Sequence, residues 1–90
     1  MHTVVVRVAI GDPEVAAKAL REQIIPQVSK APGFITGHWT QSDDGSNGQS
    51  MIVFESEEAA RAVAEQVRNG PVPETVTIES VEVRKVVGNA

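Results

Sequence analysis

The sequence TVVVRVAI, Thr3 to Ile10, predicts a β-strand that is apolar on both sides. Side chains alternate between the two faces of a strand. One face carries Val4, Val6, Val8 and Ile10, and the other carries Thr3, Val5, Arg7 and Ala9. Two helices of a small domain cover one side of a sheet, so the second apolar face predicts a partner, most simply a second copy of the chain. We expect Val5 and Ala9 to lie in that homodimer interface.

The composition bounds the class of protein. The 90 residues predict one domain, residues 1–90. A domain of this size buries only a modest share of its surface on folding, and self-association would increase that share. The net charge of −4, with Lys and Arg scattered, gives no surface for phosphates, so no nucleic acid partner is expected. The lack of cysteine excludes thiolate zinc sites and cysteine nucleophiles, and no metal or cofactor is expected. No segment approaches the ~20 apolar residues of a membrane span, so we expect a cytoplasmic protein.

The next segment predicts a helix with an interruption. Asp12 suits an N-cap, and Pro13 suits the first helical position, where an N–H would be unpaired. Pro26 lacks the N–H that a helix interior needs and is expected to kink the helix or divide it in two. The sequence Ala31-Pro32-Gly33 ends the helix. The spacing of three and four residues typical of a buried helix face joins Ala16, Leu20, Ile24 and Val28.

Two strands and a turn follow. Phe34 to Gln41 predicts a strand, Ser42 to Gly48 a hairpin turn rich in turn-forming residues, and Ser50 to Glu55 the third strand. Strict alternation places one set of side chains of the second strand on one face, namely Ile35, Gly37 and Trp39. It places the other set on the opposite face, namely Phe34, Thr36, His38 and Thr40.

The rest of the chain completes the pattern. Ser56 is suited to cap a second helix that ends at Asn69-Gly70-Pro71. The alternation slips within the last strand, Thr75 to Val87, which predicts a bulge near Glu79 and Ser80. The order is therefore that of an α+β, ferredoxin-like βαββαβ domain, with two helices on one face of a four-stranded antiparallel sheet. Two such sheets packed face to face would form a dimeric α/β barrel.

A family resemblance rests on the order of several features along the chain. An alternating first strand and a proline-bearing helix come first. They are followed by the helix stop Ala31 to Phe34 (APGF), Trp39 on the next strand, and Val53 to Ala60 (VFESEEAA). The chain resembles the dimeric α/β-barrel superfamily, and within it the small antibiotic-biosynthesis-monooxygenase-like (ABM-like) domains. Members include cofactor-independent oxygenases, haem-degrading enzymes and many proteins without a known reaction. The motifs are structural, so the resemblance implies the fold more strongly than an activity.

The resemblance does not extend to the haem-degrading members. Those have an asparagine on the first strand, with a tryptophan and a histidine on or near the second helix. This chain has Arg7 among valines and neither Trp nor His between Glu57 and Arg68. Haem is therefore not expected.

Three residues are candidates for function, and each of them has an alternative structural interpretation. His38 could accept a proton near neutral pH or simply lie at the sheet surface or dimer contact. Trp39 could stack on a flat aromatic ligand or anchor the core or interface. These two residues alternate along one strand, so they face opposite sides of the sheet. Arg7 could hold an anion or form a cross-strand ion pair; the acids within reach are Glu55, Glu79 and Glu82.

Two functional hypotheses follow. The first is a non-catalytic dimeric module for ligand sequestration or assembly, without an identifiable catalytic constellation. The second is a cofactor-independent monooxygenase-like enzyme that binds a small aromatic or apolar compound between the interrupted helix and the sheet. Trp39, Ile24 and Phe34 are the candidate ligand-binding residues, and His38 or Arg7 would be the polar, catalytic group.

Overall fold

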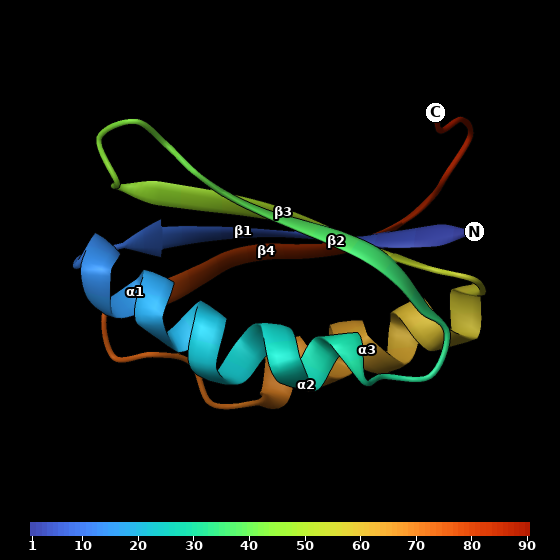
Figure 1. Cartoon of the computed structure of the whole chain (residues 1–90), viewed down its shortest axis with the longest axis horizontal. Helices are drawn as coiled ribbons and strands as arrows, with labels where there is room; N and C mark the ends of the chain where they lie inside the picture. Colours follow the sequence, from blue (N-terminus) through green and yellow to red (C-terminus); the bar gives the residue numbers. More distant parts are fainter.

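The computed structural model describes all 90 residues as four strands and a covering layer of helices (Figure 1). The elements are β1 (His2–Ile10), α1 (Pro13–Ala19), the π-helical turn η1 (Leu20–Ile24), α2 (Ile25–Ser29), β2 (Phe34–Gln41), β3 (Asn47–Phe54), α3 (Glu57–Asn69) and β4 (Val76–Lys85).

The sheet has the order β2-β3-β1-β4, with every neighbouring pair antiparallel. Figure 1 views the sheet edge-on, with all helices on one side of it. The predicted ferredoxin-like fold is confirmed. We call the side of the sheet that carries the helices the helix side, and the opposite side the open face.

A bulge in β4 restores the alternation of that strand. Arg7 of β1 pairs with Ser80, and the next residue, Val8, pairs with Ile78, so Glu79 is an extra residue on β4. The bulge predicted near Glu79 and Ser80 is confirmed. It turns both Ile78 and Val81 to the helix side, where they pack against the core.

A second bulge was missed by the sequence pattern. Phe34 pairs with Phe54 and Thr36 with Val53, so Ile35 is an extra residue on β2. Phe34 therefore lies on the helix side with Trp39, and the prediction that Phe34 shares a face with His38 is wrong. The ring of Phe34 packs edge-on against Phe54, with ring centroids 6.2 Å apart.

The first helical segment, which we define as α1, η1 and α2, is interrupted before its proline. The Asp12 carboxylate accepts the N–H groups of Glu14 and Val15, at 3.1 and 3.3 Å, and begins α1. The N–H of Ile25 donates to the carbonyl of Leu20, five residues back. Pro26 then falls in the first turn of α2, where a missing N–H is tolerated. The segment stays helical from Pro13 to Ser29, so the predicted interruption takes the form of a π-helical turn before Pro26 and does not divide the helix in two.

Helix α3 closes the core. Ser56 caps it through a 3.1 Å bond from the N–H of Ala59 to its hydroxyl. The small side chains of Ala60 and Ala64 are fully buried and let α3 approach the sheet closely. No helix of the chain has the length and hydrophobicity to cross a membrane. The core cluster comprises Val4, Val6, Ile52, Phe54, Ala60, Val63 and Ala64.

Candidate functional site

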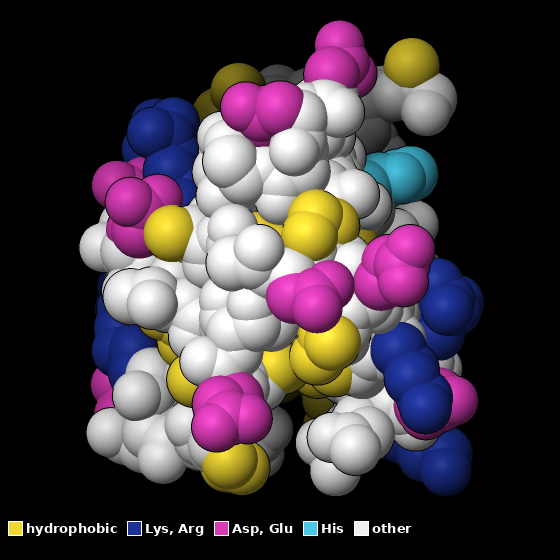
Figure 2. All heavy atoms as spheres, turned by 90° about the vertical axis from the view of Figure 1, so that its left-hand side faces the viewer, with side chains coloured by type: hydrophobic (Ala, Val, Ile, Leu, Met, Phe, Trp, Pro, Cys, Tyr) yellow, Lys and Arg dark blue, Asp and Glu magenta, His cyan; other side chains and the backbone are white.

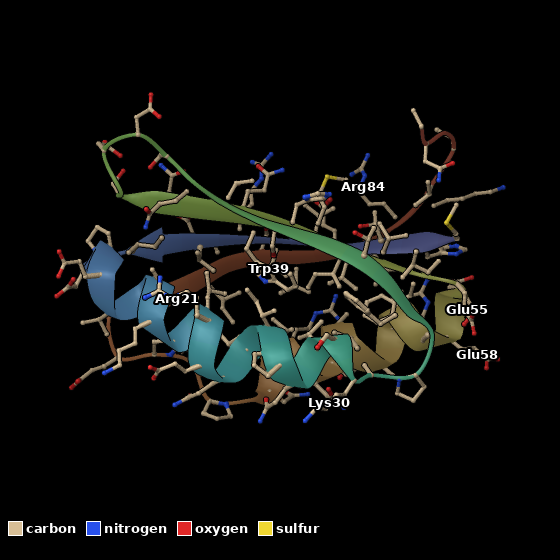
Figure 3. The ribbon with its side chains drawn as sticks, in the orientation of Figure 1. Arg21, Lys30, Trp39, Glu55, Glu58 and Arg84 are labelled. Carbon is tan, nitrogen blue, oxygen red and sulfur yellow. The ribbon has the colours of Figure 1, made fainter.

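The helix side of the sheet offers an apolar surface around Trp39. The six-membered part of the Trp39 ring lies over Gly37, where an added Cβ would come within 2.7 Å of it. Gly37 therefore lets the indole lie back along β2. Figure 3 shows Trp39 pointing from β2 to the helical layer, between the positions of Arg21 and Lys30.

One hydroxyl interrupts this apolar surface. Ser50 of β3 lies in register between Val6 of β1 and Trp39 of β2, and it is 8% exposed. Val8 follows on the same side of β1 and is half-buried. The strand residues beside Trp39 on this side thus include no ionisable side chain, and their polar groups are the Ser50 hydroxyl, the amide of the exposed Gln41 and the indole N–H.

The first helical segment covers this surface incompletely. The backbone of α3 lies close to β1, β3 and β4, and that of α2 lies close to β2, whereas α1 and η1 keep a larger backbone distance from the strands. Leu20 and Ile24 are half-buried and do not belong to the core cluster. The residues between them, 21–23, are exposed, so the apolar stripe is the side of the helix turned to the protein.

We call the surface formed by Leu20, Ile24, Val8, Trp39 and Ser50 the helix-side site. Figure 2 views the end of the molecule where α1 begins and shows hydrophobic side chains at the surface, with Asp and Glu side chains among them and Lys and Arg side chains towards either side. Apolar surface therefore reaches solvent at this end. A small, largely apolar molecule would match the residues of the helix-side site.

The candidate ligand-binding residues lie on the helix side, but the candidate polar groups do not. Trp39 and Ile24 belong to the helix-side site, and Phe34 packs against the core beside it. His38 pairs with Met51 and Arg7 pairs with Gln49, and both candidates are exposed on the open face. The expectation that His38 or Arg7 orients a ligand in the helix-sheet pocket is therefore wrong.

Arg7 also lacks the predicted cross-strand partner. The four ion pairs of the chain do not include it. Glu82, a predicted partner, instead binds Arg84, with Nη1 and Oε2 2.9 Å apart. Neither Glu55 nor Glu79 reaches Arg7 within ion-pair distance. Arg7 lies in a hollow of the open face.

Sequence reasoning did not single out three residues of the helix-side site, namely Val8, Leu20 and Ser50. Alternation along β3 places Ser50 on the same face as Ile52 and Phe54, so its position was predictable. A single serine in a strand does not by itself indicate a binding site. Leu20 was predicted to be a buried helix residue. Its partial exposure follows from the π-helical turn, which hydrophobic spacing does not encode.

The open face mixes apolar and charged side chains. Val5 and Ala9 lie on it as predicted, and Val5 is 8% exposed between its cross-strand neighbours Met51 and Glu82. Met51 is 45% exposed. The accessible apolar surface at the centre of this face is therefore provided more by Met51 than by Val5.

Two carboxyl groups have perturbed pKa values, and both have structural roles. The N–H and hydroxyl of Ser46 and the hydroxyl of Ser42 donate to Asp44 and lower its pKa to about 2. This is the turn chemistry expected for residues 42–48. The Arg61 guanidinium lowers the pKa of Glu57 on α3. The structure brings together no group of three or more His, Cys, Asp or Glu side chains.

Comparison with known proteins supports the fold. No protein-family model matches the chain, and no curated protein matches it. A monooxygenase from Streptomyces coelicolor, solved with nanaomycin D, is similar over 99% of this chain and 89% of its own, with a TM-score of 0.64 and 17% identity. A dimeric ferredoxin-like protein from an uncultured marine organism is similar over 100% of this chain and 98% of its own, with a TM-score of 0.66 and 12% identity.

A third solved structure is a haem degrader from Mycobacterium tuberculosis, MhuD, with two haems in its active site. It covers 97% of this chain and 98% of its own, with a TM-score of 0.55 and 22% identity. Identities at this level establish a shared fold and leave the chemistry open. These three structures therefore confirm the predicted ferredoxin-like fold.

Proposed function

We propose that this chain is a homodimeric α/β-barrel module that binds a small, largely apolar molecule at the helix-side site and does not transform it. The observation that carries the proposal is the incomplete burial of the apolar stripe of the first helical segment above a sheet surface without ionisable groups. A candidate proton acceptor, His38, lies on the opposite face.

The energetics favour an occupant at the helix-side site. Burying apolar surface yields roughly 25 cal/mol per Å² removed from water. Leu20, Ile24 and Trp39 are each only half-buried in the chain alone. A planar hydrocarbon ring placed between them would remove both its own surface and theirs from water. We infer a ligand that is aromatic, because the indole of Trp39 offers a flat partner for stacking.

The polar groups of the site suit a neutral ligand. A charged ligand would lose hydration without gaining an opposite charge, because the site has no ionisable side chain. The Ser50 hydroxyl both donates and accepts, and the indole N–H of Trp39 donates. A ring with one hydroxyl or carbonyl oxygen therefore fits better than an acid or an amine.

Isothermal titration calorimetry with 1-naphthol tests the binding proposal. Leu20→Phe enlarges a half-buried side chain of the helix-side site, and we expect it to lower the affinity at least about tenfold, which is ~1.4 kcal/mol. The matched control is Ile35→Phe, at a bulge residue that is 47% exposed outside the site. Binding that is absent in the unmodified protein, or equally reduced in both variants, would contradict the proposal.

Ser50→Ala tests the polar contact separately. Loss of one neutral hydrogen bond costs about 0.5–1.5 kcal/mol. We therefore expect a weaker affinity for 1-naphthol and an unchanged affinity for naphthalene, which has no hydroxyl. An equal loss for both compounds would show that Ser50 acts through packing.

Oxygen uptake, measured with an oxygen electrode, tests the proposal that the protein does not transform its ligand. A cofactor-independent monooxygenase-like enzyme would convert the CH₂ group of anthrone and one O₂ into a quinone carbonyl and water. We expect oxygen uptake at the rate of the protein-free solution. Protein-dependent uptake that is lost in Leu20→Phe would establish the enzymatic alternative at the same site.

We place the interface of the proposed homodimer on the open face. The chain measures 33 × 24 × 20 Å, and the sheet, seen edge-on down the shortest axis in Figure 1, spans the 33 Å and 20 Å axes. A face of these dimensions is of the order of the ~800 Å² that each partner buries in a standard interface. Met51 is 45% exposed at its centre, so Met51→Asp should place two carboxylates between the sheets and dissociate the dimer. Val15→Asp, at a residue of α1 that is 47% exposed, is the matched control. Light scattering that reports a dimer for Met51→Asp would place the interface elsewhere.

A further inference from the structure

On the open face, one cation and one anion lack partners within the chain. Arg7 and Glu79 take part in none of the ion pairs, whereas Arg84 and Glu82 bind each other. Both unpaired residues are exposed, and both line the same hollow, together with Ala9, Asn47 and Gln49. The bulge places Glu79 there, because it inserts this residue opposite the step between Arg7 and Val8.

We propose that the occupant of this hollow is a second copy of the chain, and that Arg7 of each protomer pairs with Glu79 of its partner. This inference rests on the proposed homodimer and specifies how its two copies are aligned. A two-fold interface is self-complementary: where residue 7 meets residue 79 of the partner, residue 79 also meets residue 7. The two ion pairs therefore form together.

The argument for a partner acid comes from desolvation. Arg7 stands between Val5 and Ala9 on the open face, so packing two such faces removes its guanidinium from water. A buried guanidinium without an opposite charge is strongly disfavoured. In the single chain no acid lies at ion-pair distance from the guanidinium, so we place the paired acid in the partner. Glu79 is the free acid of this hollow, and its own burial would be equally unfavourable without a cation.

Charge reversal and mixing test the pairing. Arg7→Glu and Glu79→Arg each place like charges opposite one another at both contacts, and we expect both variants to be monomers of 9.6 kDa at a concentration where the unmodified protein is a dimer. An equal mixture of the two variants restores opposite charges at both contacts. It should therefore form a heterodimer of twice the chain mass, as measured by light scattering and native mass spectrometry.

Two controls show whether loss of the dimer comes from the charges at residues 7 and 79. One makes the same charge reversals elsewhere on the surface, and the other checks that each variant is folded. Arg21→Glu and Glu74→Arg make the same changes at exposed residues away from the open face and should leave the homodimer intact. Circular dichroism should show that every variant is folded, because Arg7 and Glu79 are both exposed in the single chain.

Each outcome distinguishes this inference from the proposal beneath it. A monomeric unmodified protein would overturn the homodimer itself. A dimeric unmodified protein whose two variants also remain dimers would overturn the pairing and leave the homodimer standing. Two monomeric variants whose mixture stays monomeric would likewise overturn the Arg7–Glu79 pairing.

Discussion

Helix α3 and the first helical segment cover the same side of the sheet, yet they pack in different ways. On α3, Ala60, Val63 and Ala64 are buried, and the helix packs against three strands. On the first helical segment only Ala16 is buried, although its apolar stripe is just as regular in sequence. The difference teaches that a regular stripe specifies which side of a helix faces the sheet, whereas the small residues and the uninterrupted hydrogen bonding of α3 determine how closely a helix approaches.

The largest expected effect comes from enlarging one alanine in each helix. Ala64 is fully buried, so Ala64→Leu should overpack the core and lower the free energy of unfolding by about 1–3 kcal/mol. Ala17 is half-buried beside the loosely packed stripe, so Ala17→Leu should be tolerated. For a domain of this size each 1 kcal/mol shifts Tm by roughly 4–8 °C, which thermal unfolding resolves. Equal losses of unfolding free energy in Ala64→Leu and Ala17→Leu would show that the two helices pack equally closely, which would contradict the account.

Truncation provides a second, smaller contrast. Val63→Ala removes two methyl groups from a side chain that is 3% exposed, at ~0.8 kcal/mol for each group plus a cavity contribution. Leu20→Ala removes more atoms, but from a half-buried site, so we expect a smaller loss in urea unfolding. A larger loss for Leu20→Ala would show that η1 is packed as tightly as α3.

Much of this fold could be predicted, because it is encoded by local patterns. The alternation of β1, the caps Asp12 and Ser56 and the bulge at Glu79 are each visible in neighbouring residues. The bulge at Ile35 was not visible in the sequence. One extra residue in a short strand still allows a regular alternation of side chains between the two faces, so nothing in the pattern reveals it. The alternation of β1 also placed Arg7 on the face of Val5 and Ala9, so the hypothesis that Arg7 orients a ligand in the helix-sheet pocket did not follow from that pattern.

The smallest expected effect lies in the turn between β2 and β3, which serves as a reference outside both helices. The folded pKa of Asp44, about 2, is below the ordinary value of 3.8. Its contribution to stability is therefore present above pH ~4 and is lost as the pH falls towards 2. The difference in unfolding free energy between the unmodified protein and Asp44→Asn should shrink over this range, while 1-naphthol affinity at neutral pH stays the same. A difference that does not vary with pH would contradict the turn geometry.

The most direct test of the contrast between the two helices is a ¹H–¹⁵N correlation spectrum recorded during titration with 1-naphthol. The sole tryptophan of the chain, Trp39, gives one indole N–H signal that reports on the site. We predict shifts at that signal and at the amides of Leu20, Ile24 and Ser50, with little change at Ala64 in α3. Shifts spread equally over α3, or confined to the open face around Met51, would contradict the account.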